Sequence, residues 1–157
     1  MSTMEFLLYH GTTDAHVYDV LDEVDETIGN LLKDFGRGFY TTTRSDKALD
    51  WANLQAARSG REPAVVEFSL SREDFIALDC LFFIRGDKHA YDYWHFVQWC
   101  RSTGAHNRLH AEWYDLVAGP ISGDWKKQTT IPNSDQFSFH TARGVDVLNA
   151  SKKQRIS

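Results

Sequence analysis

The sequence has few cysteines and no long apolar run. Cys80 and Cys100, its two cysteines, stand far apart and form no CxxC pattern, which predicts buried, reduced thiols of a cytosolic protein. No run of 18 apolar residues occurs, and this excludes a membrane-spanning helix. Residues 1–10 lack the charged start, the apolar stretch and the cleavage site of a secretion signal. We therefore expect a cytoplasmic protein.

Basic charge is also scarce. The 17 lysines and arginines are outnumbered by 22 acidic residues, so the formal net charge is -5. This argues against a broad basic face that binds nucleic acid non-specifically, while a nucleic acid held in a local groove stays open. A length of 157 residues without repeat, low-complexity tract or linker predicts one domain, 1–157.

Helices and strands are mixed along the chain rather than strictly alternating, which predicts an α+β fold. Alternating apolar and β-branched residues predict strands at 5–9 (running into a polar HGTT turn), 38–43, 64–70, 114–118 and 136–141, with a further candidate at 75–78. Helical patterns are expected at 15–24, 46–58, 89–101 and 142–148. Ser45 is the expected N-cap of the second helix, and Gly60 follows its end. We expect Ala48, Trp51, Ala52, Gln55 and Ala56 to share one face of that helix.

A polar and aromatic set follows the first two strands. His10-Gly11-Thr12 lies at the first, Gly38-Phe39-Tyr40 at the second, and Trp51 comes one helical stretch later. Aromatic rings can stack on a planar heterocycle, the glycine backbone can pair with a carboxamide, and the imidazole can bond a sugar hydroxyl. This chemistry alone does not single out NAD. Each residue also has a purely structural explanation, as a hydrogen-bonded histidine or a core aromatic.

Several segments resemble known families. Tyr9-His10-Gly11-Thr12 resembles the His-Gly-Ser/Thr motif of the diphtheria-toxin and poly(ADP-ribose) polymerase type of ADP-ribosyltransferase. The segment 35–40 and the following 45–51 resemble that superfamily's Phe-Gly-Lys-Gly-Ile-Tyr segment and its helix. More closely, DFGRGFYTTT, YDLVAGPI and QFSFHT resemble DUF3990, a family of small bacterial proteins of uncharacterised function that is assigned the same fold. The similarity runs in order over most of residues 7–148.

The resemblance implies two small packed sheets with an NAD cleft between them. His10 would bond the 2′-hydroxyl of the nicotinamide ribose, Gly11 would pair with the carboxamide, and Tyr40 and Trp51 would sandwich the nicotinamide. The neighbouring positions implied to contact NAD are Thr12, Arg37 and Phe39. Arg37 either pairs with the diphosphate of NAD or is a solvated turn residue.

Two positions depart from the superfamily pattern. Gln136 stands where a catalytic Glu opens a late strand, and Ala48 stands where a serine hydroxyl helps to bind the carboxamide. Cleavage of the nicotinamide–ribose bond passes through an oxocarbenium-like species, which fixed negative charge stabilises. The catalytic set implied is His10, Tyr40 and Gln136, and Gln136 leaves three outcomes open: weaker chemistry, an acceptor that needs no strong base, or loss of catalysis. Glu112 is a candidate substitute acid.

The resemblance thus implies an NAD-dependent ADP-ribosyltransferase, a bacterial toxin or effector. NAD is the co-substrate, the acceptor is a protein or nucleic acid, and a cognate antitoxin is a possible partner. A catalytically weak or inactive NAD or ADP-ribose binding module is the alternative. We expect no metal, because Cys100, His106, His110 and Glu112 form an incomplete ligand set. The basic residues 152–155 are expected to form a frayed, solvated end, or a docking segment for a partner or nucleic acid.

Overall fold

Two small sheets and a two-stranded ribbon contain the strands of the computed structural model, which describes residues 5–28, 33–103 and 114–157. The first sheet has the order β1-β3-β9, the second β2-β8-β5-β4, and the ribbon pairs β6 with β7. The strands are β1 (Glu5–Thr13), β2 (Phe39–Thr41), β3 (Pro63–Ser71), β4 (Cys80–Phe82), β5 (Leu116–Gly119), β6 (Ser122–Asp124), β7 (Thr129–Thr130), β8 (Gln136–Phe139) and β9 (Lys152–Arg155). The helices are α1 (Val17–Asp22), α2 (Ser45–Ser59), α3 (Arg72–Ile76), α4 (Tyr91–Thr103) and α5 (Ala142–Ala150). The α+β prediction is confirmed.

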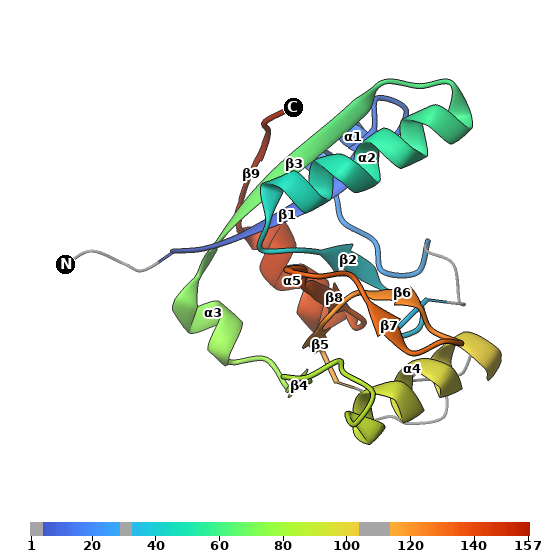
Figure 1. Ribbon diagram of the computed structural model, residues 1–157. Coiled ribbons are helices and arrows are strands. Elements are labelled where there is room, and N and C mark those ends of the chain that lie inside the picture. Colours follow the sequence, from blue (N-terminus) through green and yellow to red (C-terminus); the bar gives the residue numbers. More distant parts are fainter. Residues whose placement is uncertain (1–4, 29–32, 104–113) are drawn as a thin grey trace.

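The helix α2 covers the first sheet through small residues. Ala48, Ala52 and Ala56 are buried, and their spacing of four places them on one helix face. Figure 1 shows α2 running along β1 and β3. Gly60 ends the helix in the left-handed conformation, with φ +67°, which glycine adopts without steric cost. Trp51, which was predicted on the same helix face, is 40% exposed.

The strand β1 continues through His10, Gly11, Thr12 and Thr13, where the sequence predicted a turn. These residues pair in register with β3, for example Thr12 with Ala64. Two β-branched threonines suit an extended backbone, and β3 supplies a partner for each of them. The prediction of a polar turn after Tyr9 was therefore wrong.

Three further local predictions were wrong. The segment 75–78 is not a strand, because α3 begins before it and Ser71 caps that helix by accepting a hydrogen bond from Asp74 N at 3.1 Å. Helix α2 begins at Ser45 itself, after Arg44 in the N-cap position. Residues 152–155 form β9, which pairs with β3 through the backbone. They are a strand of the first sheet rather than a frayed end.

The larger core cluster lies between the two sheets. It joins Leu8 of β1 and Phe68 of β3 to Phe39, Leu116 and Phe139 of the second sheet. A second cluster lies on the opposite face of the second sheet, where α4 packs. It contains Phe35, Phe83, Ala90, Tyr93, Trp94, Val97 and Val117. Within the described ranges, no helix is long and apolar enough to cross a lipid bilayer.

Candidate functional site

The two sheets meet where β1 passes β2. Tyr9 and Thr42 form an isolated antiparallel bridge with backbone bonds of 2.8 and 2.9 Å. In an antiparallel strand the backbone groups of alternate residues face the same side. The N–H and C=O of Gly11 therefore face the same side as those of Tyr9, towards β2 and away from β3. Extending the register of the bridge sets Gly11 opposite Tyr40.

His10, the next residue of β1, reaches β2 through its side chain. Its Nδ1 lies 2.7 Å from the carbonyl oxygen of Tyr40, and its ring stacks on Phe39 at 4.1 Å between centroids. A carbonyl can only accept, so Nδ1 donates the hydrogen bond and Nε2 of the neutral ring carries a lone pair. Burial, with the nearby Lys33 ammonium adding to it, lowers the pKa of His10 to about 4. At neutral pH Nε2 can accept a hydrogen bond from a hydroxyl group.

Gly11 has a packing role of its own. A Cβ atom built on it would lie 2.1 Å from the carbonyl oxygen of Ala48 and 3.0 Å from the amide nitrogen of Ala52. The absence of a side chain therefore lets α2 approach β1. Thr12, the next residue, is buried at 8% exposure against β3. The backbone of Ala48 thus lies directly against the strand at Gly11.

Tyr40 and Trp51 flank a cation. The Tyr40 hydroxyl donates to Gly36 O at 2.6 Å and accepts from Phe35 N at 3.0 Å, which fixes its ring. The ammonium Nζ of Lys33 lies 4.9 Å from the Trp51 ring centroid and 5.8 Å from that of Tyr40. Both distances are within the range of cation–π attraction. Burial lowers the pKa of Lys33, with the charge of Arg101 as a second cause.

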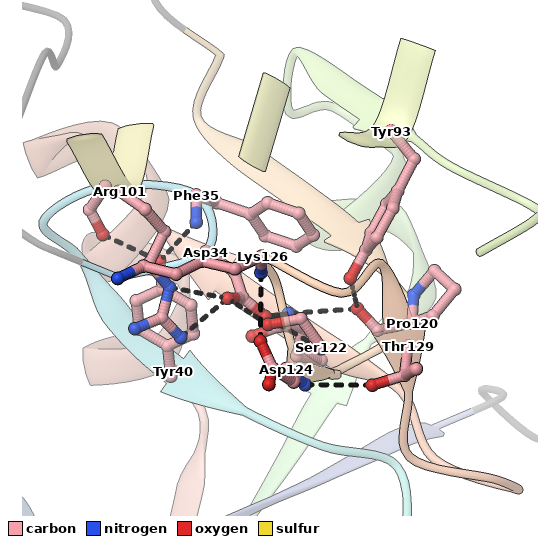
Figure 2. A network of polar contacts seen from close by, with 12 residues as sticks. Asp34, Phe35, Tyr40, Tyr93, Arg101, Pro120, Ser122, Asp124, Lys126 and Thr129 are labelled. Carbon is pink, nitrogen blue, oxygen red and sulfur yellow. Dashed lines mark hydrogen bonds and ion pairs between the residues drawn. The ribbon is translucent and has the colours of Figure 1, made fainter. Parts of the chain in front are cut away.

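A buried carboxylate lies beside this aromatic pair. Asp34 is 3% exposed and accepts from Arg101 Nη2 at 2.6 Å and from Ser122 N at 2.9 Å, and Figure 2 shows it between these two residues. Gln136, 7% exposed, donates from Nε2 to Asp34 Oδ2 at 2.7 Å and to Pro120 O at 3.0 Å. The network thus joins the loop before β2 to α4, β6 and β8.

Arg37 lies next to this network between two glycines. Its carbonyl accepts from His140 Nδ1 at 2.7 Å, while its Nε is buried without a hydrogen-bond partner in the part of the chain that the structure describes. A Cβ on Gly38 would lie 2.7 Å from His140 Nδ1. An unsatisfied guanidinium donor suits an anionic oxygen, such as that of a phosphate.

The structure brings most of the predicted site residues together. His10 bonds Tyr40, and Lys33 Nζ lies within about 6 Å of the ring centroids of both Tyr40 and Trp51. Phe39 lies in the core on the opposite face of β2 from Tyr40 and reaches the site through its stacking on His10. Gln136 lies on the Tyr40 face, because Tyr40 pairs with Ser138 and side chains two residues apart share a face.

Sequence reasoning missed Lys33, Asp34, Arg101 and Ser122. Asp34 precedes the Phe-Gly-Arg-Gly segment, but nothing in its local pattern indicates a bond to a residue 102 positions later. Only the fold supplies that proximity.

Nothing in the described residues assembles a metal site. No group of three or more His, Cys, Asp or Glu side chains able to hold an ion occurs among 5–28, 33–103 and 114–157. Cys80 and Cys100 are free thiols, and burial raises the pKa of Cys100 to about 12. His106, His110 and Glu112 lie outside the described residues.

Comparison with known protein families matches residues 6–131 to the family described as "Protein of unknown function (DUF3990)". The chain belongs to this family. The part of this DUF3990 member that matches includes His10, Asp34, Tyr40 and Trp51, and it ends before Gln136. The search of curated proteins finds no match.

Proposed function

We propose that this DUF3990 protein is an NAD-dependent ADP-ribosyltransferase that acts as a toxin or effector on a macromolecular acceptor. In this reaction the bond between C1′ of the ribose and the nicotinamide nitrogen breaks, and nicotinamide leaves. A bond forms between C1′ and a nucleophilic atom of the acceptor, whose proton passes to solvent. NAD is consumed as co-substrate.

The observation that carries this proposal is the cation between Tyr40 and Trp51. The nicotinamide ring of NAD is a planar pyridinium cation, and the faces of two aromatic rings attract such a cation. Lys33 Nζ lies 4.9 and 5.8 Å from the two ring centroids, within cation–π range of both, which supports binding of a cationic ring by the same two aromatic residues. Binding of NAD then requires the flexible Lys33 side chain to move aside.

Three further contacts suit the remaining parts of NAD. The lone pair of His10 Nε2 can accept from the 2′-hydroxyl of the ribose, because Nδ1 is already committed to Tyr40 O. The backbone groups of Gly11 face the side on which the carboxamide would lie. Arg37 Nε, buried and without a partner among the described residues, fits an oxygen of the diphosphate.

Gln136 favours a second candidate function. Both hydrogens of its amide are used by Asp34 and Pro120, and an amide is no general base at neutral pH. An NAD or ADP-ribose binding module without turnover is consistent with this residue. The two functions differ in whether nicotinamide is released.

One assay separates these two functions. Purified protein is incubated with cell lysate and NAD labelled in its adenylate part, and labelled macromolecules and free nicotinamide are measured. A transferase yields both, and protease or nuclease digestion then identifies the acceptor class. Bound NAD without either product would refute transfer and leave the binding module.

Single substitutions test whether the release of nicotinamide depends on the candidate site. Trp51→Ala and His10→Gln should each reduce nicotinamide release at least tenfold, because each removes one contact to the nicotinamide riboside. Trp125→Ala is the control, since Trp125 also has a lysine over its ring, at 5.7 Å, but belongs to the turn between β6 and β7 rather than to α2. Equal activity in all three variants would place the reaction elsewhere in the molecule.

A further inference from the structure

The amine of Lys33 lies inside the candidate site without a polar partner. Its Nζ is held over the rings of Trp51 and Tyr40, at 4.9 and 5.8 Å from their centroids. Burial lowers the pKa of His10 and the charge of Lys33 adds to this effect, so the two side chains lie near each other. No hydrogen bond or ion pair to Lys33 Nζ occurs within residues 5–28, 33–103 and 114–157. The amine is therefore not committed to another contact by a directional bond.

The neighbouring carboxylate is already occupied. Asp34 accepts hydrogen bonds from Arg101, from Ser122 and from Gln136. Burial and the charge of Arg101 lower the pKa of Lys33, and the charge of Asp34 opposes them. At a given pH a larger fraction of this amine is neutral than for an exposed lysine, and the neutral amine is the nucleophilic form.

The proposed function fixes the place of the reacting carbon. Nicotinamide would lie between Tyr40 and Trp51, and His10 would contact the 2′-hydroxyl of the ribose. The carbon C1′ joins the nicotinamide ring to the carbon that carries this hydroxyl. Lys33 Nζ, near both rings and near His10, therefore lies beside the place of C1′. NAD displaces the side chain on binding, and the departure of nicotinamide lets it return to C1′.

We propose that Lys33 is an internal acceptor, to which the protein transfers ADP-ribose from NAD and so limits its own activity. The inference rests on the proposed function and deepens it by naming one acceptor. The bond between C1′ and the nicotinamide nitrogen breaks, and its electron pair leaves with nicotinamide. The lone pair of the Lys33 amine forms the new bond to C1′, and one proton of the amine passes to solvent. The attached ADP-ribose then fills the site and excludes further NAD.

Peptide mapping of the unaltered protein tests this transfer without relying on a variant. The protein is incubated with NAD and no added acceptor, digested, and its peptides are analysed by mass spectrometry. We expect an ADP-ribosyl group on the peptide that contains Lys33. The modified fraction should be equal at a high and a low protein concentration, because donor and acceptor are held in one molecule. Free ADP-ribose in place of NAD controls for chemical glycation and should leave Lys33 unmodified.

Lysine variants separate position from reactivity. Lys33→Met removes the amine, and Lys126→Met and Lys153→Met are the controls. Lys126 also lies over an aromatic ring, at 5.7 Å from that of Trp125. Burial also lowers the pKa of Lys153, whose Nζ donates to Asn149 Oδ1 at 3.1 Å. Lys33→Met should lose the modification, and both controls should keep it.

Modification of Lys33 should also reduce later activity. After incubation with NAD alone, the unaltered protein should lose transfer to acceptors in a lysate that is added afterwards, and it should lose binding of 1-methylnicotinamide, which carries the cationic ring without ribose. Lys33→Met should keep its own initial rate through the same treatment. Lys33→Arg keeps a cation but presents no neutral amine, so it should behave like Lys33→Met and serves if that variant does not fold.

The outcomes distinguish the inference from the proposed function. Nicotinamide release in lysate without modification of Lys33 would overturn the inference while the proposed function stands. Equal modification by free ADP-ribose, or a modified fraction that falls on dilution, would also overturn the inference alone. If the unaltered protein releases no nicotinamide, the proposed function and the inference fail together.

Discussion

The closest approach between β1 and α2 yields a stringent prediction, the effect of Gly11→Ala. The added Cβ would lie 2.1 Å from Ala48 O, whereas ordinary van der Waals contact begins at 3.4 Å. The helix and strand must therefore separate by about 1.3 Å, the difference between these two distances. The nearest atoms belong to helix backbone, so no side-chain rotation relieves the contact.

The cost follows from this overpacking. Insertion of one methyl group into a tightly packed contact destabilises a protein by about 1–3 kcal/mol, and a backbone clash belongs at or above the upper end. Replacement of glycine by alanine recovers only about 0.4–1 kcal/mol through the unfolded chain. We expect a net loss of at least about 2 kcal/mol in the free energy of unfolding. Because Trp51 lies on α2, its ring should also shift away from Tyr40 and binding of 1-methylnicotinamide should weaken.

Urea denaturation followed by tryptophan fluorescence measures the first effect, and calorimetric titration measures the second. Gly123→Ala is the matched control, because a Cβ there meets its nearest neighbour, Thr129 O, at an ordinary 3.6 Å. This control should unfold within about 0.5 kcal/mol of the unaltered protein. A Gly11→Ala variant as stable as Gly123→Ala would refute the close packing of α2 on β1.

Three further predictions concern charge and strand pairing. The folded protein holds the pKa of His10 at about 4, below the ordinary 6.5. His10 therefore contributes stability that is present above pH 6.5 and is lost as the pH falls towards 4. Unfolding measured against pH should show a loss of at most about 3 kcal/mol, and less for a partly exposed ring, and His10→Gln should lack this loss. Lys33→Met should tighten binding of 1-methylnicotinamide about fivefold by removing the competing ammonium, and the same gain in Lys126→Met would refute competition at this site. Deletion of residues 152–157 should lower the melting temperature by several degrees, because β3 loses the backbone bonds to β9; an unchanged melting temperature would show that this strand contributes no stability.

The sequence predicted those helices and strands in which the polarity of the side chains matches their burial. From Val66 on, the alternation in AVVEFSL follows the buried and more exposed positions of β3, and Gly60 ends α2 as expected. The segment KKQR of β9 has no apolar residue, since its pairing with β3 uses backbone atoms that every residue carries. The apolar segment 75–78 was predicted as a strand because its apolar pattern does not reveal the helix start that Ser71 caps.

The candidate site was predictable only where its residues are close in sequence. His10, Gly11 and Tyr40 were predicted from two short motifs and a resemblance, although β1 does not end at His10. The bond between Asp34 and Gln136 depends on how β8 pairs between β2 and β5, and no local pattern contains that information.

The pairing of β2 with β8 also determines when the site can form during synthesis. Tyr40 pairs with Ser138, and Asp34 meets Gln136, so the ribosome must synthesise the chain through β8 before both contacts exist. The pair β1–β3 can form earlier, because its residues are closer in sequence. Contacts of such long sequence separation form slowly. A nascent chain can therefore hold His10 in a paired strand before β8 has been synthesised, and the assembled site forms only after β8.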